Sequence, residues 1–177
     1  SCLTAQPVAA APRPLARGKA AKDENFPVAS RFLPARTRSA VIGFYRFARL
    51  ADDVADSRQL APRAKLAALD AAEAMLLGRR GGIETSAETP HEPGVPVEHA
   101  RHLLQAFRKD AVQSRYETWS ELLAYCNFSA APVGRFLLAL HGEDRKTWRC
   151  ADALCNPHQI LNHVQDCKAD FLQLDRV

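Results

Sequence analysis

AVIGFYRFARLADDVAD, residues 40–56, carries apolar residues at the spacing of an α-helix. One stripe of that helix contains Val41, Tyr45, Ala48, Asp52 and Asp56. The last two positions of this stripe are acidic, and two carboxylates four residues apart on one helical face repel each other by about 0.2–0.5 kcal/mol. If the stripe faces the interior, desolvation adds to this cost unless a cation is present. The pair therefore predicts a site for a divalent metal ion.

A second acidic pair at the same spacing, Asp166 and Asp170, lies near the end of the sequence. The apolar stripe of its helix is expected to contain Ile160, Val164, Cys167 and Phe171. The acidic pair lies about 100° round the helix from that stripe, on a strip with Gln159, Asn162 and His163. By periodicity alone this polar strip faces solvent. The alternative is that both acidic pairs converge on one cavity.

Arg49 lies one helical turn before the first pair, so a plain salt bridge with Asp52 or Asp53 is the simpler interpretation of these carboxylates. The metal interpretation has a chemical consequence. Mg²⁺ keeps some of its waters and typically takes one or two carboxylates plus the phosphate oxygens of a substrate, and Mn²⁺ accepts the same carboxylate oxygens. Metal ions between opposed carboxylates, helped by Arg, would stabilise a departing diphosphate. This interpretation therefore predicts a phosphate-bearing substrate.

Helical spacing continues along most of the chain, and no segment alternates as a half-buried strand does, so the sequence predicts an all-α fold. Residues 1–22, rich in Ala, Pro and Arg, are expected to be a disordered tail before a single domain at 23–177. Helices are expected at residues 23–32, 35–55, 62–77, from 97 onward, 118–140 and 145–171, with a loop at 79–96. Pro132 and Gly134 are expected to kink the helix at 118–140. Apolar residues expected to face inward include Leu66, Leu69, Ala72, Met75, Leu76, Leu103, Leu104, Phe107, Trp119, Leu122, Leu123 and Cys126.

Composition excludes several classes of function. A net charge of +4 without an arginine-rich block argues against nucleic-acid binding. No GxGxxG or GxxxxGK[ST] loop is present, so no nicotinamide cofactor is expected. The five cysteines form no CxxC or zinc spacing, which indicates a reducing compartment and a cytoplasmic location. His99 and His102 could share a metal, but an exposed polar face is the expected arrangement.

Residues 24–56, ENFPVASRFLPARTRSAVIGFYRFARLADDVAD, resemble the amino-terminal part of the squalene/phytoene synthase family. The likeness is closest to its bacterial hydroxysqualene synthase branch, which belongs to the hopanoid pathway. It continues in residues 121–134, ELLAYCNFSAAPVG, and in residues 161–170, LNHVQDCKAD. It covers about residues 24–177, whereas family members run on through further helices. The resemblance therefore implies a truncated chain, with the C-terminal helices of the domain missing.

The resemblance implies an isoprenoid synthase-type helical bundle around a central cavity. It implies that metal ligands come from a first aspartate-rich motif, Asp52, Asp53 and Asp56, and from a second, Asn162, Asp166 and Asp170. It places Arg49 and Arg176 near the diphosphate, Phe26 on the hydrocarbon cavity, and Tyr45 and Tyr125 as further cavity-side candidates.

The reaction that the resemblance implies is the Mg²⁺-dependent conversion of presqualene diphosphate to hydroxysqualene by loss of diphosphate and capture of water. Gln165 replaces a basic residue usual in related condensing enzymes, and Asp23-Glu24 replaces their Ser-Lys; both departures fit the hydroxysqualene branch. One alternative is head-to-head condensation of two prenyl diphosphates. Another is a non-catalytic helical interaction module. A hydrocarbon substrate also implies peripheral contact with a membrane.

Overall fold

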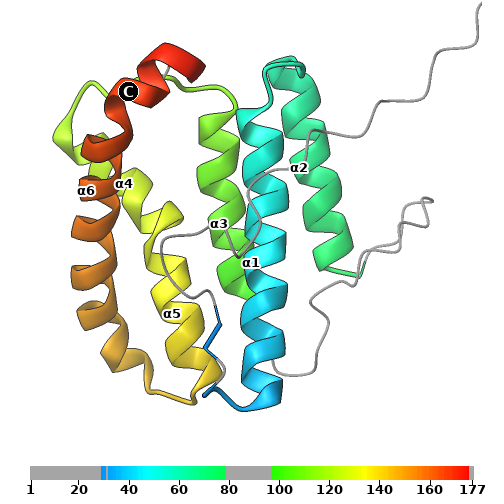
Figure 1. Ribbon diagram of the computed structural model, residues 1–177, viewed down its shortest axis with the longest axis vertical. Coiled ribbons are helices and arrows are strands. Elements are labelled where there is room, and N and C mark those ends of the chain that lie inside the picture. Colours follow the sequence, from blue (N-terminus) through cyan, green and yellow to red (C-terminus); the bar gives the residue numbers. More distant parts are fainter. Residues whose placement is uncertain (1–28, 31, 79–96, 176–177) are drawn as a thin grey trace, which may run out of the picture.

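Helix α3 (Val97–Asp110) lies at the centre of a helical bundle, packed on one side against α1 (Ala35–Asp56) and α2 (Pro62–Leu76) (Figure 1). On its other side it contacts α4 (Trp119–Ser129) and α5 (Ala131–Leu140). A short 3-10 helix, η2 (Arg145–Thr147), leads into α6 (Trp148–Leu174), which packs on α5 and α4. This computed structural model describes residues 29–30, 32–78 and 97–175. No strand occurs in these ranges, so the prediction of an all-α fold is confirmed.

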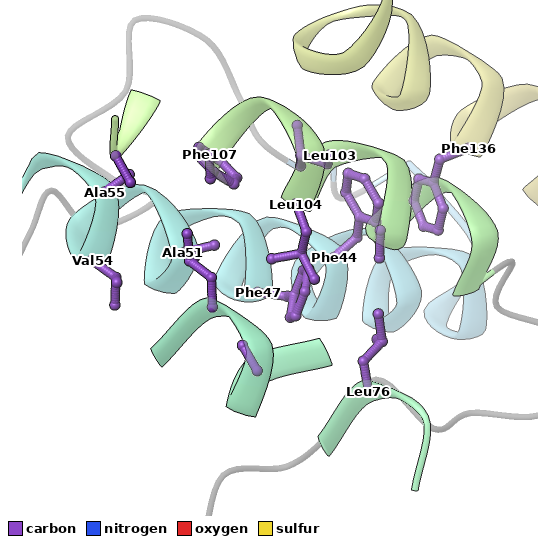
Figure 2. Packing of buried hydrophobic residues seen from close by; sticks show 14 of the residues in the cluster. Phe44, Phe47, Ala51, Val54, Ala55, Leu76, Leu103, Leu104, Phe107 and Phe136 are labelled. Atoms are coloured by element: carbon purple, nitrogen blue, oxygen red, sulfur yellow. The ribbon is translucent and has the colours of Figure 1, made fainter. Parts of the chain in front are cut away.

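The main core forms where α1, α2, α3 and α5 meet (Figure 2). Phe44 of α1 stacks on Phe136 of α5, with ring centroids 4.1 Å apart and planes 13° from parallel. Leu104 of α3 and Leu69 of α2 are completely buried in the same cluster. This core joins helices from both halves of the described chain, so the first acidic motif stands on a rigid support.

The sequence located most of the helices correctly. The expected helices at 35–55, 62–77 and from 97 onward correspond to α1, α2 and α3. The expected kink near Pro132 is a complete break, because α4 ends at Ser129 and α5 begins at Ala131 with Pro132 in its first turn. Thr118 caps α4, and its hydroxyl accepts a hydrogen bond from the Glu121 amide at 3.2 Å.

Two expectations about single aromatic residues are wrong. Trp119 was expected to face inward, but 62% of it is exposed, because it is the first residue of α4 and precedes the packed part of that helix. A helix through Phe32 does not form. Phe32 is almost fully exposed in a turn, and its amide donates to the Ser30 hydroxyl at 3.2 Å. The rest of that predicted helix, at 23–28 and 31, and the predicted tail at 1–22 lie outside the described residues.

Helices α5 and α6 approach each other closely at Gly134. A Cβ atom at this position would lie 2.7 Å from the Cys155 sulfur, so only glycine fits without movement of a neighbour.

By length and composition alone, the stretch Trp119–Leu140 is apolar enough to cross a membrane. That is weak evidence, because core helices of soluble proteins pass the same test.

His99 of α3 is buried, contrary to the exposed polar face expected for it. Its ring contacts Trp148 edge-on, with centroids 5.3 Å apart, and Trp148 in turn lies under the guanidinium groups of Arg135 and Arg145. Burial, with the positive charges of His102, Arg135 and Arg145, lowers the pKa of His99, while Glu98 opposes the shift. The imidazole is therefore held neutral in the folded protein.

This burial predicts a pH-dependent stability. The unfolded chain binds a proton at His99 more readily than the folded protein does, because only the folded-state pKa is lowered. The free energy of unfolding should therefore decrease as pH falls below about 6.5, the ordinary pKa of histidine. Urea unfolding of the wild type and the His99→Phe variant between about pH 8 and 5 measures this, with a shallower decrease expected for the variant. Equal pH slopes in the two proteins would contradict the prediction.

Candidate functional site

The first acidic motif lies at the carboxyl end of α1. Arg49 donates from Nη1 to Asp52 Oδ2 at 2.6 Å and from Nη2 to Asp53 Oδ1 at 3.2 Å, so the salt bridge predicted from spacing is present. The buried face of α1 contains Ala40, Val41, Phe44, Phe47, Ala51, Val54 and Ala55. Asp52 and Asp56 are half-buried beside this face, as is Tyr45. The acidic pair therefore lies at the edge of the core, neither inside it nor fully in solvent.

The carboxylates around Asp52 raise its affinity for a proton. The pKa of Asp52 is raised to about 7 by burial, then by the negative charge of Asp56, with smaller contributions from Asp110 and Asp53, while Arg49 lowers it. Asp110 is the last residue of α3, and its contribution shows that α3 brings a further carboxylate to the motif. Asp110 could not be identified from the sequence, because no local spacing pairs it with α1. A bound cation would relieve this concentration of negative charge.

Asp110 is also tied to Tyr125 of α4. The Tyr125 hydroxyl donates to Asp110 Oδ2 at 2.9 Å, and only 6% of Tyr125 is exposed. The Tyr125 ring lies 5.2 Å from the ring of Tyr116, in the α3–α4 connection, and 5.4 Å from the imidazole of His163 on α6. Tyr125, a cavity-side candidate from the sequence, thus links three helices close to the acidic cluster.

A cavity of about 460 Å³ opens beside the cluster, where the carboxyl ends of α1, α3 and α6 come together (Figure 1). Its lining includes the carboxylates of Asp56 and Asp110 and the basic side chains of Arg58 and Lys65. Lys65 Nζ donates to the Ala55 carbonyl at 2.6 Å, which holds the ammonium at the carboxyl end of α1. The cavity therefore places acidic and basic groups together.

Helix α6 is rotated differently from the sequence prediction. Val164 and Phe171 were expected to face inward, but 71% and 53% of them are exposed. Polar residues also face inward: Asp152 binds Arg135 of α5, Asn156 donates to Asn127 of α4 at 2.8 Å, and His163 contacts Tyr125. The expected apolar stripe is wrong at Val164 and Phe171, whereas Ile160 and Cys167 are half-buried, and Ile160 packs on the cluster that contains Tyr125.

The residues of the second motif differ in exposure. Asp170 is half-buried, whereas Asn162 and Asp166 are exposed, as the solvent-facing interpretation predicted. None of the three lines the cavity described above, to which α6 contributes Leu172 and its C-cap residue Asp175. Convergence of the two motifs is therefore not demonstrated by this cavity. Phe26 and Arg176 lie outside the described residues.

The described carboxylates fit a metal ion only if a ligand completes its coordination. Among residues 29–30, 32–78 and 97–175, no group of three or more His, Cys, Asp or Glu side chains could hold a metal by itself. Mg²⁺ does not need such a cage, because it is commonly bound by one or two carboxylates, waters and substrate phosphates. The raised pKa of Asp52, which is due in part to Asp56, identifies these two carboxylates as the pair suited to coordination together with waters and substrate phosphates.

Comparison with known proteins identifies clear relatives. Residues 19–177 match the sequence profile of the family described as Squalene/phytoene synthase. The hydroxysqualene synthase of Sinorhizobium fredii is 49% identical over 162 residues, which are 88% of this chain and 54% of that protein. That of Rhodopseudomonas palustris is 49% identical over 169 residues, which are 92% of this chain and 57% of that protein.

A solved structure supports the same relationship. The crystal structure of squalene synthase HpnC from Alicyclobacillus acidocaldarius superposes with a TM-score of 0.70 at 34% identity. The match covers 86% of this chain and 59% of that one. The isoprenoid synthase fold expected from the sequence is thereby confirmed. The chain spans little more than half the length of the curated relatives that it matches.

Proposed function

This chain belongs to the squalene/phytoene synthase family, and we propose that the full-length protein converts presqualene diphosphate to hydroxysqualene. Diphosphate leaves, the carbocation rearranges, and water captures it, so the reaction consumes no nicotinamide. The names of the relatives at 49% identity support this choice within the family.

The observation that carries the proposal is the carboxylate cluster of Asp52, Asp56 and Asp110. The charges of Asp56 and Asp110 help to raise the pKa of Asp52 to about 7, and Arg49 offsets only part of this effect. In such a cluster beside a cavity, a bound cation lowers the repulsion between the carboxylates, so binding of a cation there is favoured. Departure of a diphosphate is a reaction that needs that cation.

The residues of the chain have distinct proposed roles. Asp52 and Asp56, with Asp53, would hold Mg²⁺ or Mn²⁺ on one side, and Asp166 and Asp170, with Asn162, on the other. When bound, the metal neutralises the charge that develops on the diphosphate. Arg49 orients Asp52 and Asp53 through its two hydrogen bonds. Arg58 and Lys65 at the cavity, and Arg176, supply further positive charge toward the diphosphate.

Aromatic side chains would stabilise the carbocation after diphosphate has left. Tyr45 and Tyr125 of the described residues, together with Phe26, are the candidates, because the faces of aromatic rings attract positive charge. The hydrocarbon substrate and product imply peripheral contact with a membrane, and the scattered cysteines favour a cytoplasmic location.

The proposal is tested with the full-length protein, presqualene diphosphate and Mg²⁺, without nicotinamide, by mass spectrometry of the extracted lipids. Hydroxysqualene is expected only when the divalent metal is present, and added chelator should abolish it. Hydroxysqualene formed at an unchanged rate in chelator would contradict the metal role.

A second candidate reaction is head-to-head condensation of two prenyl diphosphates. The match to a family described as squalene/phytoene synthase favours keeping it in the test. Consumption of farnesyl or geranylgeranyl diphosphate, with presqualene diphosphate untouched, would establish this reaction instead. No reaction with any of these substrates would favour a non-catalytic interaction module.

A further inference from the structure

Helix α6 has an unusual distribution of side chains. Its outward side carries Leu154, Leu161, Val164 and Leu172, which are 67–73% exposed. Its inward side contains two specific polar pairs, Asp152 with Arg135 and Asn156 with Asn127. It also contains apolar contacts, since Cys155 meets Gly134 of α5 and Ile160 packs on the cluster of Ala106, Tyr125 and Cys126. The exposed apolar side therefore does not set the rotation of α6, which depends on these inward contacts.

A further inward contact of α6 is made by His163. This residue follows Asn162 and precedes Asp166 by three positions, so it lies inside the second motif without being one of its expected ligands. Its imidazole is half-buried, 5.4 Å from the Tyr125 ring and 6.4 Å from the Tyr116 ring. These are normal centroid separations for packed aromatic rings.

The rotation that brings His163 to Tyr125 also orients the acidic residues. Positions three and seven residues further along a helix lie on nearly the same face. Asp166 and Asp170 are those positions; Asp170 is half-buried, in agreement with this rotation, whereas Asp166 is exposed. The polar pairs at Asp152 and Asn156 hold the amino-terminal half of α6, so loss of the contact at His163 would loosen its carboxyl-terminal half and let both carboxylates shift.

The contact between His163 and Tyr125 is also connected to the first acidic motif, through Asp110. The rings of Tyr125, Tyr116 and His163 contact one another, and the Tyr125 hydroxyl donates to Asp110 at 2.9 Å. Asp110 is one of the charges that act on Asp52. A continuous line of contacts thus runs from α6 through α4 and α3 to the acidic end of α1.

We propose that His163 is a positioning residue, which sets the orientation of the second acidic motif relative to the first by packing its ring on Tyr125. It acts through the aromatic contact, without touching the substrate. The identity of the ligand, a divalent metal with diphosphate, is taken from the proposed function, and the inference rests on that function to this extent. Groups that orient metal ligands commonly change metal affinity or activity by about 10–100-fold when removed.

The test compares three variants of the full-length protein: His163→Ala, His163→Phe and the control His158→Ala, an exposed position on the same helix. Binding of Mn²⁺ in the presence of inorganic diphosphate is measured by electron paramagnetic resonance, and diphosphate release from presqualene diphosphate is measured against Mg²⁺ concentration. His163→Ala is expected to weaken Mn²⁺ binding and to raise the half-saturating Mg²⁺ concentration by about tenfold or more. The turnover rate at saturating Mg²⁺ should change much less, and His163→Phe and His158→Ala should resemble the wild type.

Unchanged metal affinity in a folded His163→Ala protein would overturn the inference, as would equal damage in the Ala and Phe variants. If the Ala variant does not fold, His163→Leu replaces it, since leucine fills the space without a ring. These measurements distinguish a failure of this inference from a failure of the proposed function. A wild type that binds Mn²⁺–diphosphate but forms no hydroxysqualene refutes only the reaction, and a wild type that does not bind Mn²⁺–diphosphate refutes both.

Discussion

Replacement of both Asp52 and Asp56 by Asn is expected to lower the consumption of presqualene diphosphate by the full-length protein by about a thousandfold or more. Removal of one preorganised electrostatic contact to a developing charge typically costs about a hundredfold to a thousandfold, and this change removes the pair. The amides keep the size of the side chains but lose the charges through which a divalent cation is held. Diphosphate release at saturating substrate and Mg²⁺ measures the effect.

The double variant should remain folded, since Asp52 and Asp56 lie beside the core and their charges disfavour each other, as the raised pKa of Asp52 indicates. Asp70→Asn is the matched control, because Asp70 pairs with Arg108 on α2–α3 and is mostly exposed. That control should retain activity. A folded double variant that consumed the substrate at the wild-type rate would refute the metal-binding role of the first motif.

The Phe136→Ala variant is expected to lose about 3–5 kcal/mol of unfolding free energy, the usual cost of truncating a buried aromatic ring. Phe136 is 1% exposed and stacks on Phe44 at 4.1 Å, so its removal leaves a cavity between α5 and α1 (Figure 2). Urea unfolding followed by helical circular dichroism measures the loss. Single domains ordinarily unfold with about 5–15 kcal/mol, so this loss would remove a large part of the stability, and nearly all of it at the lower end of that range.

Leu137→Ala is the control for this change, on the next residue of α5, where 40% of the leucine is exposed. Its cost should be about 1 kcal/mol, because Leu137 is already partly exposed to solvent and leaves no enclosed cavity. Equal losses in the two variants would show that the Phe44–Phe136 stack does not join α1 to α5 as the structure indicates.

The first acidic motif could be predicted almost completely from the sequence. Arg49, Asp52, Asp53 and Asp56 lie within two turns of one helix, so their mutual positions follow from helical geometry, and the predicted salt bridges are present. The contribution of Asp110 could not be predicted, because it depends on how α3 packs against α1. The hydrogen bond from Tyr125 to Asp110 likewise joins two helices across a connection of irregular structure.

Helix positions and breaks were determined by the sequence itself, since they depend on local signals such as the prolines before α1, in α2 and in α5, and the cap at Thr118. Tertiary structure decided which side of a helix faces its neighbours. Periodicity gives the angles between side chains on one helix, but the rotation of that helix about its own axis depends on its partners. For this reason Val164 was wrongly expected inside and His99 wrongly expected outside, whereas contacts with Tyr125 and Trp148 place His163 and His99 inward.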